Sequence, residues 1–179
     1  MPPGMDWYDT VFELIDMRSF SNLWFWIALA VLWSSVSHFV MGVPFDMLIR
    51  ARRQGGQAEQ DFEDMVRISI NRISYIEGRA GLWLTGLISF ILASLLVLGF
   101  YYHVEFSQAL FLLGAPLVAV GMVTLRAAHR IRREGLTGEP LRHRIVVARF
   151  WIQVIGMISI FITAMWGMYQ NLSLGGLYS

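Results

Sequence analysis

Apolar residues are gathered into four long stretches, and charged residues are confined almost entirely to the segments outside them. The stretches cover residues 20–43, 80–102, 106–125 and 146–169. Each is about 20 residues long, the length that an α-helix needs to cross a hydrocarbon core about 30 Å thick. The sequence therefore predicts an all-α integral membrane four-helix bundle, with residues 1–179 forming a single membrane domain.

The connections between the stretches differ in length and character. Residues 101–105 are the whole link between the second and third stretches, and so short a turn predicts two antiparallel helices that lie side by side. The other connections, 46–79 and 126–145, are long and polar. Within the first, apolar residues recur at helical spacing over 61–77, which predicts an interfacial amphipathic helix leading directly into the second span.

Residues 5–18 show a related pattern before the first span. Apolar and aromatic side chains gather near one side of the predicted helix, and acidic residues occupy the remaining positions. We interpret this segment as an N-terminal amphipathic helix at the membrane interface. An acidic start without a small-residue cleavage site is not typical of a secretory signal peptide, so we expect the N-terminus to be retained.

Small and weakly polar residues recur every fourth position in three of the predicted spans. These residues are Ala30, Ser34, His38 and Gly42 in the first span, Thr85, Ser89 and Ala93 in the second, and Ser159, Thr163 and Gly167 in the fourth. Such stripes allow membrane helices to approach closely and to exchange hydrogen bonds. The sequence therefore predicts that these positions pack against other helices.

The distribution of arginine predicts an orientation. Six arginines lie in the first polar connection, seven lie between Arg126 and Arg149, and only Arg18 lies elsewhere. The positive-inside rule then places both polar connections in the cytoplasm and both termini in the periplasm of a bacterial inner membrane. Tryptophan and tyrosine residues near the span ends agree with this multi-pass topology.

The composition excludes several kinds of chemistry. The chain contains no cysteine, so disulfides, thiolate zinc sites and cysteine nucleophiles are absent. No glycine-rich phosphate loop, paired metal-ligand motif or catalytic triad order is present. We therefore predict no enzymatic activity, no catalytic or metal-binding residues and no cofactor.

His38 is the one histidine within a predicted span, and ionisable residues inside a membrane are often functional. A bis-histidine haem would need a second histidine at similar depth, and His129, just beyond the third span, is the nearest candidate. A neutral His38 hydrogen-bonded to Ser34 or to a neighbouring helix is the alternative that we favour. His103 and Glu105 share the short outer turn, where solvated charges are far commoner than catalytic pairs.

The arginine-rich connections are the most plausible interaction surface. The candidate residues are Arg50, Arg52, Arg53, Arg67, Arg72, Arg130, Arg132 and Arg133. Topology alone demands basic cytoplasmic loops, and anionic membrane lipids attract them. The mixed charges of the 61–77 helix are less typical of a purely lipid-facing segment, so a docked cytoplasmic protein is an equally good alternative. No nucleic-acid partner is expected, because no basic and aromatic platform is present.

Two runs of sequence carry a resemblance to a known family. Residues 5–26 read MDWYDTVFELIDMRSFSNLWFW, and residues 42–53 read GVPFDMLIRARR. The chain resembles an alphaproteobacterial family of four-span membrane proteins often labelled a component of the SufBCD complex, a cytosolic iron-sulfur assembly scaffold. The resemblance extends over most of the chain and implies association with iron-sulfur cluster assembly. It includes no catalytic motif and implies no site residues.

The leading hypothesis from the sequence is a non-enzymatic accessory or anchoring subunit of the inner membrane that docks a protein partner. One alternative is a supernumerary subunit of a respiratory or photosynthetic membrane complex. Another is a small redox protein that binds haem, or a transport protein, built around His38.

Overall fold

The computed structural model describes residues 23–175, and nearly all of them are helical. In chain order the elements are α2 (Leu23–His38), β1 (Phe39–Val40), β2 (Val43–Pro44), α3 (Phe45–Gln54), α4 (Gly56–Leu96), the π-helix η2 (Val97–Tyr101), α5 (Glu105–Glu134) and α6 (Gly138–Gly175). The all-α prediction is therefore confirmed for this part of the chain. The predicted helix over residues 5–18 lies outside the described residues.

Three segments within residues 23–175 are long and apolar enough to cross a membrane. They are Gly56–Tyr101, Glu105–Glu134 and Gly138–Gln170. They cover the predicted spans 80–102, 106–125 and 146–169 to within one residue. The described part of the chain thus contains three candidate membrane helices, where the sequence predicted four.

The predicted helix over residues 20–43 is wrong beyond His38, where α2 ends. Strands β1 and β2 follow as an antiparallel hairpin, with Met41 and Gly42 at its tip at φ values of 55° and 76°. Positive φ at both central residues is the geometry of a tight hairpin turn and cannot continue a right-handed helix. As described, α2 has 16 residues. At about 1.5 Å per residue it is roughly 24 Å long, shorter than a typical hydrocarbon core.

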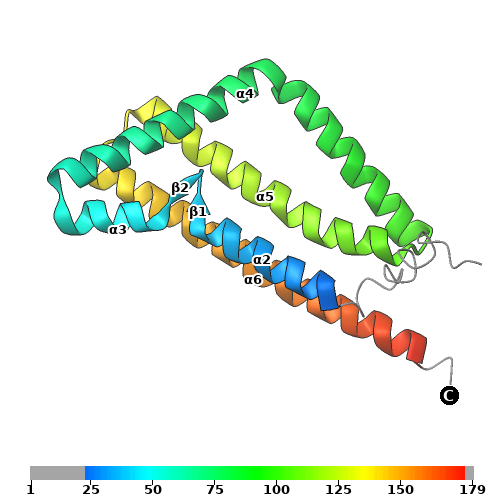
Figure 1. Ribbon diagram of the computed structural model, residues 1–179. Coiled ribbons are helices and arrows are strands. Elements are labelled where there is room, and N and C mark those ends of the chain that lie inside the picture. The colour runs from blue at the N-terminus through cyan, green and yellow to red at the C-terminus, as the bar shows by residue number, and fades with distance from the viewer. Residues whose placement is uncertain (1–22, 176–179) are drawn as a thin grey trace, which may run out of the picture.

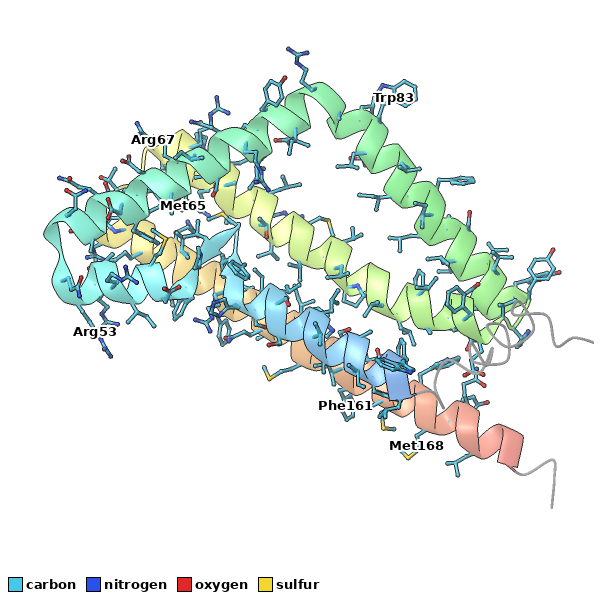
Figure 2. All side chains as sticks on the ribbon, viewed as in Figure 1. Arg53, Met65, Arg67, Trp83, Phe161 and Met168 are labelled. Atoms are coloured by element: carbon cyan, nitrogen blue, oxygen red, sulfur yellow. The ribbon has the colours of Figure 1, made fainter. Side chains whose placement is uncertain are left out.

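Helix α4 joins the first polar connection to the second predicted span without a break, and it bends shortly before Trp83 (Figures 1 and 2). Gly78 and Gly81 lie at this point of the sequence, and closely spaced glycines are a common cause of helix bending. The buried residues of α4 are Phe62, Val66 and Ile70, all in its first half. None of the residues in its most apolar stretch is buried. The second half therefore diverges from α6 and α2, and approaches α5 mainly near η2 (Figure 1).

The hydrophobic core is centred where α3, the first half of α4, the end of α5 and the start of α6 meet (Figure 1), and it extends to α2 and the hairpin. Its members include Leu48, Phe62, Ile131 and Ile145, one from each of the helices that meet at this centre. The apolar face predicted over residues 61–77 thus packs against the protein's own helices. Contact of this segment with the membrane surface stays a prediction.

Helix α2 lies along α6 (Figure 1). Its buried side chains are Leu29 and Trp33, and Trp33 is only 3% exposed. Gly156 on α6 makes room for the indole, because a Cβ added there would lie 2.8 Å from Cε3 of Trp33. The absence of a side chain at Gly156 therefore allows this close contact.

Candidate functional site

The arginine-rich connections form a packed unit, which we call the polar module. It consists of α3, residues 56–79 of α4, residues 126–134 of α5 and residues 138–149 of α6. These segments lie together at one end of the molecule, and the turn between η2 and α5 lies at the other (Figure 1). Both polar connections of the sequence therefore meet on the same side of the apolar helices.

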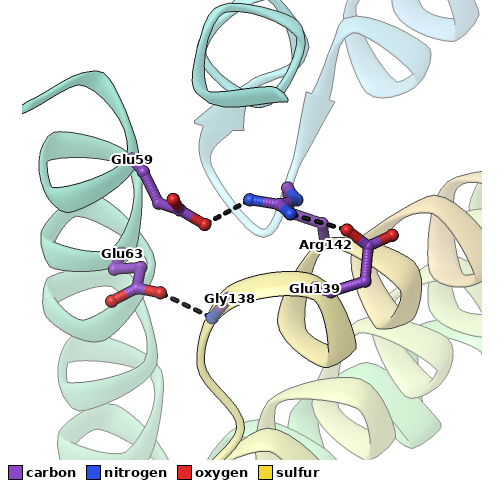
Figure 3. Close-up of polar contacts among 5 residues, drawn as sticks. All are labelled: Glu59, Glu63, Gly138, Glu139 and Arg142. Atoms are coloured by element: carbon purple, nitrogen blue, oxygen red, sulfur yellow. Dashed lines mark hydrogen bonds and ion pairs between the residues drawn. The ribbon is translucent and has the colours of Figure 1, made fainter. Parts of the chain in front are cut away.

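A group of polar contacts ties α4 to the start of α6 (Figure 3). Arg142 donates hydrogen bonds to Glu59 on α4 and, at 2.6 Å, to Glu139 on its own helix. The backbone N–H of Gly138 donates to the carboxylate of Glu63 at 2.6 Å. The side chain of Arg142 is only 17% exposed, whereas that of Glu139 is 83% exposed. Arg142 therefore acts as an internal strut between segments 83 residues apart.

The charges of this group perturb one another. The hydrogen bond and the positive charge of Arg142 lower the pKa of Glu139 below its usual 4.5, and Arg52 on α3 contributes in the same direction. The hydrogen bond to Glu139 in turn raises the pKa of Arg142. Both groups are therefore ionised at neutral pH, so the pairing is charged.

Two further contacts fix the edges of the polar module. Nε2 of His129 on α5 lies 2.6 Å from the carboxylate of Glu77, near the bend of α4. The guanidinium of Arg149 on α6 lies 3.5 Å from the centre of the Phe45 ring, at the start of α3. A cation over an aromatic face is attracted to the ring, so this contact ties α3 to α6.

The eight arginines predicted to interact are all exposed. Four are paired with acids on the same helix: Arg50 with Asp46 at 3.7 Å, Arg67 with Asp64 at 2.8 Å, and Arg130 and Arg133 both with Glu134, at 2.9 and 3.9 Å. Arg53 and Arg67 project from opposite sides of the polar module (Figure 2). The structure thus distributes these arginines around the polar module, so no single face collects them all.

Two hollows on the polar module combine predicted interaction residues with arginines that were not predicted. One, of about 350 Å³, lies between α5 and α6 and is lined by Arg126, Arg130, Arg144 and Trp151 among others. A neighbouring hollow of about 330 Å³ shares Arg126 and Arg130 and adds His129 and Arg133. Neither Arg126 nor Arg144 was among the predicted interaction residues. Their positions at the two ends of the second connection were the only signal in the sequence.

A third hollow, of about 380 Å³, lies between α4 and the loop that joins α5 to α6. Arg67 and Arg132 line it together with the acidic side chains of Glu63 and Asp64. Two of the predicted interaction residues are thus brought together here, in surroundings of mixed charge.

The opposite end of the molecule has a buried polar centre that the sequence analysis did not identify. Gln108 on α5 is 1% exposed, and its Nε2 donates to the carbonyl of Gly99 in η2 at 2.8 Å. Its Oε1 accepts hydrogen bonds from Nε1 of Trp166 at 3.0 Å and from Gln170 at 2.6 Å. Gln108 therefore joins three consecutive elements, η2, α5 and α6, and the signal for it was a single amide near the start of an apolar span.

The predicted packing stripes fall into two groups. Ser159, Thr163 and Gly167 are buried, whereas Thr85, Ser89 and Ala93 are exposed, as are Ala30, Ser34, His38 and Gly42. Gly42 lies in the hairpin turn and not on a helix. Packing of the exposed positions against other helices therefore stays a prediction.

Of the histidines singled out in the sequence, His129 lines a hollow of the polar module, whereas His38 and His103 line none of the hollows described above. His38 is exposed at the end of α2, and its ring lies edge-on to Phe39 with the centroids 4.9 Å apart. Nδ1 of His103 lies 3.1 Å from the carbonyl of Tyr101. No group of three or more histidine or carboxylate side chains suited to a metal ion is found among residues 23–175.

Comparison with known proteins yields no relative: no protein-family model, no curated protein and no solved structure matches the chain.

Proposed function

We propose that this protein is a non-enzymatic accessory or anchoring subunit of a bacterial inner membrane, which holds the polar module at the cytoplasmic surface for a protein partner. The candidate membrane helices supply the anchor. The polar module supplies a surface whose shape is maintained by a hydrophobic core and by the strut at Arg142. A pre-organised surface loses less conformational entropy on binding than flexible loops do.

The observation that carries the proposal is the difference between the two halves of α4. The first half packs three buried side chains into the polar module, and the apolar second half leaves its small-residue stripe, Thr85, Ser89 and Ala93, exposed. The equivalent stripe on α6 is buried within the chain. Small residues allow close helix approach in membranes, so the stripe on α4 is suited to a helix from another subunit.

The orientation follows from the arginines. Because both polar connections meet at one end of the molecule, the positive-inside rule assigns this end to the cytoplasm. The start of α2 and the end of α6 lie toward the opposite end (Figure 1), so periplasmic termini require α2 and the hairpin that follows it to cross the membrane together. The resemblance to the SufBCD-associated family makes iron-sulfur assembly proteins the first partners to look for.

The test is a pull-down of the tagged full-length protein from its own membranes in mild detergent, followed by mass spectrometry. Ser89→Phe places a bulky ring in the stripe, and Leu87→Phe places the same ring on a different side of the same exposed helix. We expect a defined partner with the wild type and with Leu87→Phe, and loss of that partner with Ser89→Phe. A wild-type protein that emerges as a monodisperse monomer without a partner would overturn the proposal.

An absorption spectrum of the same eluate tests the alternative built around His38. A Soret band that disappears in the His38→Ala variant would favour a haem protein over an accessory subunit.

A further inference from the structure

The hollow between the end of α5 and the start of α6 combines basic and apolar walls. Three arginines line it, Arg126 and Arg130 from α5 and Arg144 from α6. Val123, Val147 and the indole of Trp151 line the rest. We call it the arginine hollow.

The positive charge of the arginine hollow is poorly compensated. Arg130 pairs with Glu134 at 2.9 Å, but the side chains of Arg126 and Arg144 make no hydrogen bond or ion pair with another residue in the range 23–175. No aspartate or glutamate belongs to the described lining of the arginine hollow or of its neighbour. An anion is therefore the complementary ligand, and guanidinium groups are well suited to phosphate oxygens.

The small residues at the base explain why this site is open between two closely packed helices. Ala127 and Ala148 are 7% and 3% exposed and are part of the hydrophobic core. Their short side chains let α5 and α6 approach each other, so the longer arginine and tryptophan side chains form the walls above them.

The position of the hollow along the helices selects one class of anion. Arg126 directly follows the predicted span 106–125, and Arg144 lies two residues before the span 146–169. Val123, Val147 and Trp151 lie inside those spans, on the membrane side of the arginines. Tryptophan is typical of the membrane interface, and basic pockets between helices on the cytoplasmic side bind anionic lipid headgroups.

We infer that the arginine hollow is a binding site for an anionic phospholipid of the inner leaflet. The headgroup phosphate lies against Arg126 and Arg144, and the first part of an acyl chain lies against Val123, Val147 and Trp151. A free phosphate ion would use the arginines alone. The inference rests on the proposed membrane orientation and is independent of the protein partner.

The experiment uses the purified full-length protein in a neutral detergent at about 0.15 M salt, where charges more than about 8 Å apart are largely screened. It is titrated separately with a short-chain phosphatidylglycerol, with phosphatidylcholine of the same chain length and with inorganic phosphate. Native mass spectrometry counts the bound molecules. The variants are Arg126→Gln with Arg144→Gln, and a control with the same change of charge, Arg53→Gln with Arg72→Gln.

We expect the wild type to bind phosphatidylglycerol in preference to phosphatidylcholine. The Arg126→Gln/Arg144→Gln variant should bind it at least about tenfold more weakly, because two charge-assisted contacts to the phosphate are lost. The control should stay within about twofold, because its arginines lie outside the arginine hollow. Equal losses in the two variants would show that only general positive charge is involved and would overturn the site.

Trp151→Ala separates the two sources of phosphate and keeps the test decisive if the arginine variant does not fold. A lipid site predicts weaker phosphatidylglycerol binding in this variant, because the apolar wall is lost. Unchanged lipid binding, or inorganic phosphate that displaces the lipid at equal concentration, would overturn the lipid assignment. Retention of the copurifying partner by the arginine variant would show that lipid binding and docking are separate properties.

Discussion

The contact between Gly156 and Trp33 makes a sharp test of how α2 is held. In the Gly156→Ala variant the new methyl carbon would lie 2.8 Å from Cε3, 3.2 Å from Cζ3 and 3.4 Å from Cδ2 of the indole. Carbon atoms in favourable contact are about 3.5–4.0 Å apart. Either the indole or the helix must therefore move by several tenths of an ångström, and the indole has little room because Trp33 is 3% exposed.

The cost follows from overpacking. An extra methyl group in a well-packed site typically costs about 1–3 kcal/mol. For a chain of this size that range corresponds to a fall of roughly 2–12 °C in the unfolding temperature. Because the buried side chains of α2 are Leu29 and Trp33 alone, much of the effect should appear as detachment of α2 from α6.

The control is the same substitution at Gly86 on α4, where an added Cβ meets no atom within 4 Å. Gly86→Ala should be neutral or stabilising by up to about 1 kcal/mol, because alanine favours a helix. Thermal unfolding in detergent, followed by near-ultraviolet circular dichroism, measures both variants. The double variant Trp33→Leu/Gly156→Ala should lose less stability than the sum of the two single losses, because the smaller leucine removes the clash. Identical unfolding temperatures for Gly156→Ala and Gly86→Ala would refute the packing argument.

Three further predictions concern the polar contacts at the two ends of the molecule. Gln108→Leu removes the acceptor of the Trp166 indole from a buried site and should destabilise the protein by about 1–3 kcal/mol in the same thermal assay. Arg142→Met leaves Glu59 without its partner and should loosen α4 from α6, which faster hydrogen exchange in residues 56–70 would reveal; unchanged exchange would contradict the strut. The lowered pKa of Glu139 means that its contribution to stability is complete above its unfolded-state pKa and is lost as the pH falls below about 4.5 through the folded-state value. The difference in unfolding temperature between the wild type and Glu139→Gln should therefore shrink as the pH falls, and a difference that grows in acid would contradict this sign.

The sequence predicted the three candidate membrane helices well, because length and apolar composition alone decide whether a helix can cross a bilayer. The same criterion failed over residues 39–43. Those residues are as apolar as the helix before them, and the break depends on a hairpin turn at Met41 and Gly42. Hydropathy does not detect a turn built from apolar residues. The neighbouring Gly42 and Pro44 were the signal in the sequence that the helix ends before residue 43.

Local sequence patterns could not predict the packing of the polar module, for a different reason. Helical spacing over residues 61–77 indicates an apolar face but not its partner, and a membrane surface and a neighbouring helix require the same pattern. The deciding contacts join residues far apart in sequence, as Glu59 and Arg142 do. The packing stripes carry the same ambiguity: the stripe at Thr163 is buried in this chain and the one at Ser89 is not.

The arginines show why a charge count predicts topology better than it predicts a site. The positive-inside rule treats all arginines near the spans alike. In the structure Arg142 and Arg149 are occupied by internal contacts, while Arg67 and Arg130 are paired with acids on their own helices. An arginine is available to a ligand when it lacks such contacts and lines a hollow together with other arginines. Arg126 is the clearest case because it lines two hollows. The number of arginines therefore predicts the orientation of the chain, whereas the position of each arginine between the helices decides whether it can bind a ligand.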